Sequence, residues 1–338
     1  MSTTIRDVAK RLNLSITTVS RALDGYDDVA PTTRQLVEKT ARKMGYVPNR
    51  AARQLRRRRT DTIGYVLPAE SAGFTDLFFS EFIAGMSDAA SAGQYDLLVG
   101  AAPPESKAEK ALYERWVQGG KVDGIVINRV RLSDWRLSYL SRQRIPHVSL
   151  ERSLSRLSFV GIEVDSFLAL QELVAHLLEK GHCRIAYIGG PADLKIDHDR
   201  LAGYRAGLGA AKIGLDAQWI VRSDMTSDGG YRTALSLLQL AVPPTALVCI
   251  NDLTAMGALH AARERGLLTG RDVAISGFDG LAETAHTEPP LTTLEQPVYS
   301  VAQRLTQMIL ALIRGETISE PQVKIQPQLK IRASTDGQ

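Results

Sequence analysis

The stretch TIRDVAKRLNLSITTVSRAL, from Thr4 to Leu23, decides how the beginning of this chain folds. Apolar residues recur at helical spacing from Ile5 to Leu12, and the threonines before Ile5 are suited to cap a helix. A second apolar stripe runs from Ile16 to Leu23 and follows Ser15, whose hydroxyl is suited to an N-cap. This spacing predicts two short helices joined by a tight turn, which is the geometry of a helix-turn-helix.

The polar residues of the second predicted helix lie off its apolar stripe. Threonine and arginine side chains in such positions can contact base edges or phosphates in the major groove of DNA. An ordinary helical hairpin has the same spacing, so this stretch alone leaves both interpretations open. The residues of the stretch that we expect at the DNA are Thr4, Ser15, Ile16, Thr17, Thr18, Ser20 and Arg21.

Two further motifs follow: Tyr46-Val-Pro-Asn49, and AARQLR from Ala51 to Arg56. In this order and at this spacing, the three motifs resemble the beginning of LacI/GalR-family transcriptional repressors. The resemblance continues to about Ile331 and covers nearly the whole chain. It implies a multidomain protein, with an all-α helix-turn-helix DNA-binding head and an α/β core of two lobes, similar to periplasmic sugar-binding proteins.

The expected domains combine this resemblance with the order of the elements. We expect a DNA-binding domain at 1–47, a hinge helix or linker at 48–60, and an effector-binding and dimerisation core at 61–338. In the core, short apolar runs alternate with helical segments in two successive series, which indicates parallel, doubly wound sheets. Family topology implies lobe boundaries as follows: an N-lobe of about 61–159 and 292–321, and a C-lobe of about 160–291 and 322–331.

The resemblance also gives the hinge a role. In the family this segment becomes helical when two subunits lie side by side on operator DNA, and its leucine is wedged into the minor groove, which kinks the duplex. Leu55 occupies that position. A run of arginines follows, which suits the phosphates but is also typical of a solvated linker. The hinge residues expected at the DNA are Asn49, Arg50, Ala52, Leu55 and Arg56.

Charge is divided unevenly along the 338 residues. The whole chain carries a net charge of +4, from 41 Lys and Arg against 37 Asp and Glu. Residues 1–60 hold 14 Lys and Arg against 5 Asp and Glu, a net charge of +9, so the remainder has a net charge of −5. A basic end on an acidic body indicates a polyanionic partner at one end only.

Composition favours a soluble globular protein of the cytoplasm. No apolar run reaches the ~18 residues that span a bilayer, and the first residues lack the apolar centre of a signal peptide. The two cysteines, Cys183 and Cys249, have no metal-ligand spacing and are expected to be reduced. After Ile331 no leucine heptad follows that would join dimers into tetramers, so we expect a homodimer.

A ligand site is expected between the lobes, because ligands of open α/β sheets bind beyond the carboxyl ends of the strands. Polar residues follow several predicted strands, among them Asn128, Glu151, Asn251 and Asp279. The resemblance and this rule together select eight residues, whose carboxylates, arginines and aromatic rings suit the hydroxyls and the apolar face of a sugar. The expected effector-binding residues are Phe74, Phe78, Arg129, Asp165, Arg200, Met225, Asp252 and Phe278.

Three of these assignments, and one at the DNA, have alternatives. Asp252 can simply cap the helix that begins there, and Phe78 can belong to the core or to the dimer interface. Met225 stands where several relatives carry an aromatic residue, which leaves a stacking contact open. Ile16 stands where relatives often carry a polar residue that reads bases, so it can instead contact a thymine methyl.

The expected function is that of a dimeric transcriptional repressor that binds near-palindromic operator DNA without a cofactor or metal. A small-molecule effector, taken to be a mono- or oligosaccharide inducer, would control it. A purine-type regulator activated by a co-repressor is one alternative. A transport-associated sugar-binding protein is another, but it has no use for a basic helical head. An enzyme is the third, but the sequence contains no GxSxG, HExxH or Walker motif.

Overall fold

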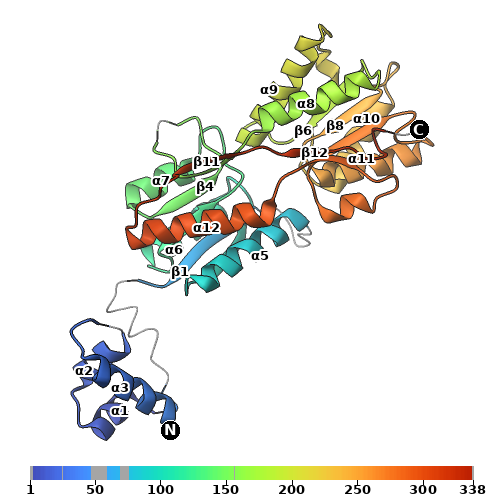
Figure 1. Ribbon diagram of the computed structural model, residues 1–338. Helices are drawn as coiled ribbons and strands as arrows, with labels where there is room; N and C mark the ends of the chain where they lie inside the picture. Colours follow the sequence, from blue (N-terminus) through green and yellow to red (C-terminus); the bar gives the residue numbers. More distant parts are fainter. Residues whose placement is uncertain (1–2, 25, 47–58, 69–75, 156, 337–338) are drawn as a thin grey trace. The chain divides into compact units, whose positions relative to one another are not determined.

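The computed structural model describes residues 3–24, 26–46, 59–68, 76–155 and 157–336 (Figure 1). The chain divides into two compact units, Met1–Thr60 and Asp61–Gln338, which we call the head and the core. The predictions for the hinge residues Asn49, Arg50, Ala52, Leu55 and Arg56, and for Phe74, lie outside the described residues. Within the described part, no helix combines the length and apolar character needed to cross a membrane.

The described part of the head contains three helices, α1 (Ile5–Leu12), α2 (Ile16–Leu23) and α3 (Pro31–Lys43). One valine from each helix is fully buried at their centre: Val8, Val19 and Val37. The predicted apolar stripes therefore face each other, and the helix-turn-helix is confirmed.

Local capping sets where the two helices of this motif begin and end. The Asp7 carboxylate accepts hydrogen bonds from the backbone N–H and the hydroxyl of Thr4, at 2.8 and 2.7 Å. Asn13 ends α1 in the left-handed conformation, with φ of 53°. The Ser15 hydroxyl then accepts the backbone N–H of Thr18 at 2.9 Å and starts α2.

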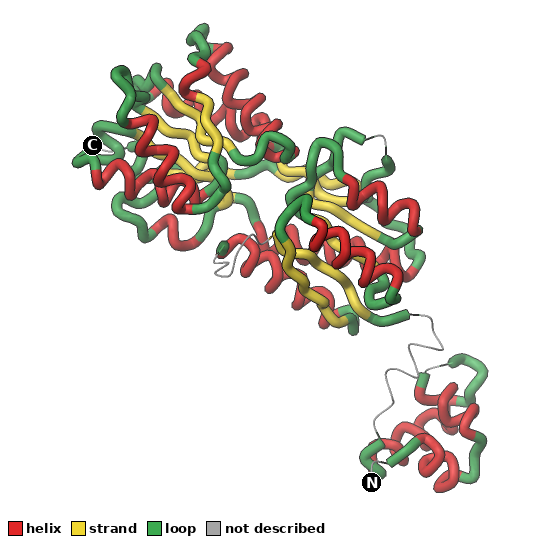
Figure 2. The backbone as a smooth tube through the Cα atoms, turned by 180° about the vertical axis from the view of Figure 1, so that it is seen from behind, coloured by secondary structure: helices red, strands yellow, loops and turns green. Residues whose placement is uncertain are grey.

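The first lobe of the core is a six-stranded parallel sheet with the order β11-β5-β4-β3-β1-β2. Helices cover both of its faces (Figure 2). Its strands are β1 (Thr62–Pro68), β2 (Asp96–Ala102), β3 (Gly124–Ile127), β4 (His147–Leu150), β5 (Gly161–Val164) and β11 (Gln322–Ile325). Its helices are α5 (Leu77–Ala92), α6 (Lys107–Gln118), α7 (Trp135–Gln143) and α12 (Val298–Arg314).

The second lobe repeats this plan with the order β12-β10-β9-β8-β6-β7, in which only β12 is antiparallel to its neighbour. Its strands are β6 (Ile185–Gly189), β7 (Ile220–Arg222), β8 (Ala246–Cys249), β9 (Ala274–Asp279), β10 (Thr292–Glu295) and β12 (Gln328–Lys330). Its helices are α8 (Ser166–Glu179), α9 (Lys195–Ala210), α10 (Ser227–Leu238) and α11 (Asp252–Glu264), with the short 3-10 helices η1 (Ala217–Trp219) and η2 (Ala282–Ala285).

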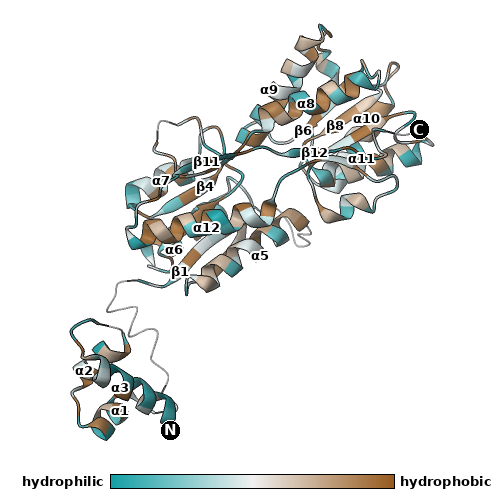
Figure 3. Ribbon diagram, in the orientation of Figure 1, coloured by the Kyte–Doolittle hydropathy of each residue, from teal (hydrophilic) through white to brown (hydrophobic). Residues whose placement is uncertain are grey.

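Alternation along the strands explains why each sheet is covered on both faces. In β1, Ile63 and Tyr65 pack in the cluster that contains α5 and α12, whereas Val66 packs in the cluster that contains α6 and α7. Successive strand residues point to opposite faces, so a strand that is apolar throughout needs helices on both sides. Hydrophobic residues accordingly make up central strands such as β8 (Figure 3).

The lobe boundaries differ from the expected ones. The chain leaves one sheet for the other after Val164, Glu295 and Ile325, four residues later in each case than the positions 160, 291 and 321 expected for the crossings. The reason is that β5, β10 and β11 each pair fully within the sheet they are about to leave. The ranges 61–159 with 292–321 and 160–291 with 322–331 are corrected accordingly.

Candidate functional site

A cavity lies between the two lobes of the core. Most of its polar residues stand at or just after the carboxyl ends of strands: Asn128 follows β3, Glu151 follows β4, and Asp279 ends β9. Both sheets therefore contribute to one site, as the rule for open α/β sheets predicts. The lining residues are Asp76, Phe78, Asn128, Arg129, Leu150, Glu151, Val164, Ile196, Arg200, Met225, Asn251, Asp279 and Gln296.

The cavity continues outward into a larger cleft. The two share Asp76, Arg129 and Met225 in their walls. Both lobes line this outer cleft, with Arg131 on one side and Asp193 on the other. A ligand can thus occupy the inner cavity alone or extend towards the mouth.

The backbone is unusual around the inner cavity. Four of its residues other than glycine have positive φ: Arg129 at 48°, Glu151 at 80°, Met225 at 65° and Asp279 at 120°. Such conformations are unfavourable for residues with a Cβ, and they persist where the surroundings hold them in place. Their concentration around one cavity, two from each lobe, supports a functional role for this cavity.

Arg200 supplies a buried cation that is held in advance of any ligand. Its guanidinium lies 3.4 Å from the centre of the Phe278 ring, and its Nη1 donates to the carbonyl oxygen of Ile250. Its Nη2 lies 4.0 Å from Oδ1 of Asp279. Within the described structure its Nε donates to no protein atom, which leaves a donor for a ligand.

Glu151 and Asp279 are two of the buried carboxyl groups that line the same cavity. One oxygen of Glu151 accepts the backbone N–H of Val164 at 3.1 Å, and burial raises the pKa of Glu151 to about 7. Oδ1 of Asp279 accepts Nε2 of Gln296 at 2.8 Å, and burial raises the pKa of Asp279 well above its usual range. The site therefore offers acceptors and donors in a nearly dry setting, where a ligand that satisfies them gains most.

On the first lobe, Arg129 and Asn128 complete the polar wall. Nη2 of Arg129 lies 3.3 Å from Oδ2 of Asp76, and its guanidinium lies 4.8 Å from the centre of the Phe79 ring. Asp76 also accepts the backbone N–H of Phe78 and so starts α5. Nδ2 of Asn128 is buried without a hydrogen-bond partner among the described residues, which marks a second donor for a ligand.

The structure separates the expected effector residues into two groups. Phe78, Arg129, Arg200 and Met225 line the cavity, and their contact with an effector stays a prediction. Asp165, Asp252 and Phe278 are not among the residues that line it.

Asp252 was expected to bind the effector, but it lies outside the cavity lining. Its carboxylate is fully buried and accepts the backbone N–H groups of Gly280 and Leu281 at 2.8 Å and the hydroxyl of Thr293 at 2.6 Å. It therefore ties α11 to the connection between β9 and β10. Asp252 does not cap α11 either. The N-cap is its neighbour Asn251, whose side chain accepts the backbone N–H of Thr254 at 3.0 Å.

Asp165 and Phe278 make structural contacts outside the cavity. Asp165 caps α8 through the backbone N–H of Leu168, and it forms an ion pair of 2.6 Å with Lys324. Phe278 lies against the Arg200 guanidinium rather than against the cavity. Asn128, Glu151, Asn251 and Asp279 also line the cavity, as their positions after predicted strands indicated, although they are not among the eight expected effector-binding residues. Asp76 and Gln296 line it as well and were not expected there.

In the head, some of the residues expected to face DNA are exposed and others are buried. Ile16 is 45% exposed and Thr17 is exposed, both at the start of α2. Arg21 is partly exposed, paired with Asp28 at 2.5 Å and stacked on Tyr26 at 4.7 Å. Ser20 is only 7% exposed, so its placement on the free face of α2 is wrong.

Thr4, Ser15 and Thr18 serve the helix ends. Thr4 is bound to Asp7, and the hydroxyls of Ser15 and Thr18 lie 2.8 Å apart. These contacts leave the three residues close to the start of α1 and α2, where helix N-termini can also face phosphates.

Comparison with known proteins assigns the family. A model described as bacterial regulatory proteins, lacI family, matches residues 4–49, and a periplasmic binding protein-like domain matches residues 174–335. The HTH-type transcriptional repressor CytR of Escherichia coli strain K12 is 34% identical over 332 residues, covering 98% of this chain and 96% of CytR. The chain belongs to the lacI family of bacterial regulatory proteins.

This lacI-family chain is a DNA-binding transcriptional regulator. The regulator CelR of Thermobifida fusca is 31% identical to it, over 98% of both chains. A structure of a CelR-cellobiose complex is 29% identical, with a TM-score of 0.75, and covers 98% of this chain and 99% of that one.

A structure of the lac repressor dimer, bound to operator and the anti-inducer ONPF, is 26% identical to the lacI-family chain. The TM-score is 0.84, and the match covers 99% of both chains. The expected fold class is confirmed: a helix-turn-helix head and a core of two parallel, doubly wound lobes.

Proposed function

We propose that this protein is a dimeric repressor whose affinity for operator DNA is controlled by a small polyhydroxylated molecule in the inner cavity. The observation that carries this proposal is the cavity itself: buried, polar, built from the strand ends of both lobes, and present in a chain with a DNA-binding head. A molecule bound there contacts two lobes at once and can favour one arrangement of them.

On DNA, two heads of a dimer would bind the half-sites of a near-palindromic operator, with one α2 helix in each major groove. Ile16 and Thr17 are the exposed residues nearest the start of α2, and Arg21 lies one turn further on. Base contacts from these residues, and a minor-groove wedge at Leu55 flanked by Asn49, Arg50, Ala52 and Arg56, would give the operator its sequence preference.

The proposed effector is a mono- or oligosaccharide that acts as an inducer. Relatives support the ligand class, since the structure of CelR contains cellobiose. Among the described residues that line the cavity, Phe78 is the single aromatic one, and Met225 stands on the opposite lobe. One aromatic wall with several carboxylates and amides suits the face and the hydroxyls of a sugar better than a flat base held between two rings.

A thermal-shift screen tests this function. Neutral mono- and disaccharides, nucleosides and nucleobases are added to the purified protein, since a ligand at a hundred times its dissociation constant stabilises the folded state by roughly 2.7 kcal/mol. We expect a saccharide to raise the melting temperature, Asp279→Asn to lose this response, and Asp165→Asn, outside the cavity, to keep it. If no saccharide acts, or if Asp279→Asn responds as the unchanged protein does, the assignment is wrong.

A further inference from the structure

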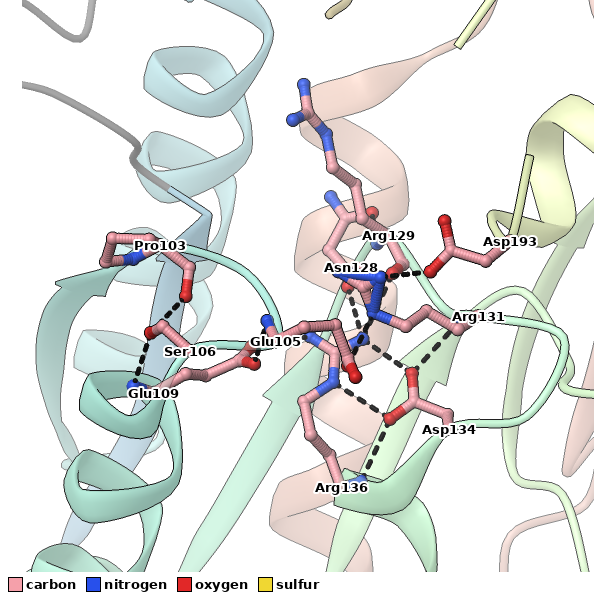
Figure 4. Close-up of polar contacts among 10 residues, drawn as sticks. All are labelled: Pro103, Glu105, Ser106, Glu109, Asn128, Arg129, Arg131, Asp134, Arg136 and Asp193. Atoms are coloured by element: carbon pink, nitrogen blue, oxygen red, sulfur yellow. Dashed lines mark hydrogen bonds and ion pairs between the residues drawn. The ribbon is translucent and has the colours of Figure 1, made fainter. Parts of the chain in front are cut away.

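The loop between β3 and α7, residues 128–131, reaches both the inner cavity and the opposite lobe (Figure 4). Asn128 and Arg129 stand on the wall of the inner cavity. Two residues later, Arg131 forms an ion pair with Asp193 of the second lobe, and its Nε lies 2.8 Å from Oε1 of Glu105 in its own lobe. A single short loop thus connects the ligand site to a contact between the lobes.

Buried groups beneath the loop hold it as one piece. Nη2 of Arg136 donates to the carbonyl oxygens of Asn128 and Arg129, at 3.3 and 3.0 Å. The carboxylate of Asp134 accepts Nε of Arg136 at 2.9 Å and the backbone N–H of Arg131 at 3.1 Å. Because Arg136 and Asp134 are only 5% and 3% exposed, this support is shielded from water. Asn128, Arg129 and Arg131 are therefore held by the same buried pair.

The contact across the cleft also includes the backbone. The N–H of Leu132 donates to the carbonyl oxygen of Asp193 at 2.8 Å, and the N–H of Lys195 donates to that of Val130 at 2.9 Å. Arg131 and Leu194 thus form an antiparallel bridge that joins two otherwise separate sheets. We call residues 130–132 and 193–195, with the Arg131–Asp193 ion pair, the clasp.

The second half of the clasp is anchored to the cavity as well. Lys195 is the first residue of α9, and the same helix carries Ile196 and Arg200 into the cavity wall. Asp197, in the same helix, accepts through Oδ1 the backbone N–H of Gly190 at 2.9 Å and so fixes the loop that leads to Asp193. Both halves of the clasp are continuous with residues that a ligand would touch.

We propose that the clasp holds the two lobes together across the mouth of the cleft when no ligand is bound. A ligand enters when the clasp opens, and contacts to Asn128, Arg129 or Arg200 then stabilise its reclosure. Arg131 and Asp193 are positioning residues in this scheme, because they set how often the cleft opens without contacting the ligand in the inner cavity. The regulatory meaning of the clasp rests on the proposed function, but its presence in the free protein does not.

Hydrogen–deuterium exchange of the full chain without ligand tests the clasp. The backbone amides of Leu132 and Lys195 should be protected, and Asp193→Asn should speed their exchange at least about fivefold, the lower end of typical coupling between sites. Side-chain exposure of 52% at Asp193 makes this variant compatible with folding. Glu105→Gln is the matched control, since it removes a partner of the same arginine within one lobe and should leave both amides unchanged.

Two results would overturn the proposal: exchange in Asp193→Asn equal to that in the unchanged protein, or equal acceleration in Glu105→Gln. Because no ligand is present, either result is independent of the effector screen. Once a ligand is found, its association rate gives a second readout. Because the ligand enters through the open state, Asp193→Asn should speed association by the factor by which it increases opening, and Glu105→Gln should not.

Discussion

Asp252 shows that a residue beside the cavity can serve the fold instead of the ligand. Its carboxylate satisfies two backbone N–H groups and the Thr293 hydroxyl in a fully buried position. Asp252→Ala leaves these donors without partners, so we expect the free energy of unfolding to fall by about 2–4 kcal/mol. Urea unfolding measures this loss. An unchanged stability would contradict the bracing role and return Asp252 to the list of effector contacts.

The raised pKa of Glu151 predicts that the stability of the protein depends on pH. Burial raises its pKa from 4.5 to about 7, so the folded chain holds this proton more tightly than the unfolded chain. Its stabilising contribution is therefore complete below pH 4.5 and is lost as the pH rises through about 7. Glutamine cannot ionise but can still accept the Val164 N–H.

The Glu151→Gln variant should therefore gain stability relative to the unchanged protein as the pH rises from 5 to 8, by about 3 kcal/mol. Urea unfolding of both proteins across this range gives the difference directly and cancels the titration of Asp252 and Asp279. A difference that does not vary with pH would show that Glu151 is not buried as described.

For single residues, the sequence predicted the position of the site better than it predicted which side chains line the cavity. Asn128, Glu151, Asn251 and Asp279 stand at or just after the ends of strands, and each lines the cavity. The choice between Asn251 and Asp252 failed because adjacent residues at a helix start point in different directions. Which of them faces the cavity depends on how α11 packs against β9 and β10, and local spacing does not contain that information.

Among the elements, the pair α10 and α11 is the most sensitive to a small change. A Cβ on Gly257 would lie 1.9 Å from the carbonyl oxygen of Ser227, and one on Gly230 would lie 2.2 Å from that of Thr254. The two helices can cross this closely only because both positions lack a side chain. The contact is backbone against backbone, so no flexible side chain can move aside.

Gly257→Ala should therefore destabilise the core by about 3 kcal/mol, the upper end for overpacking. Gly209→Ala is the matched control, because Gly209 lies in α9 of the same lobe with nothing within 4 Å of the added Cβ. It should be neutral or slightly stabilising, since alanine favours helix. Thermal unfolding of both variants tests this, and equal melting temperatures would refute the close crossing.

Element types were predictable from periodicity, whereas sheet membership was not. The stripes of α1 and α2 and the apolar runs of the core appear where the sequence placed them. The crossings, however, come after Val164, Glu295 and Ile325, because a strand such as β5 is assigned to a lobe by its partner β4 and not by its own residues.

At the scale of the whole molecule, charge and architecture agree. The basic residues 1–60, with a net charge of +9, belong to the unit that carries the helix-turn-helix, and the acidic remainder belongs to the unit that carries the cavity. Attraction to DNA is thus confined to one unit and ligand binding to the other. A ligand in the cavity must therefore change the affinity of the protein for DNA.

The most direct test is the dissociation constant of the full chain for a duplex selected from random DNA, measured with and without the saccharide found in the thermal-shift screen. We predict that the saccharide weakens binding between about fivefold and a hundredfold, and that Asp279→Asn binds the duplex normally but does not respond. A saccharide that stabilises the core and leaves the dissociation constant unchanged would contradict the account.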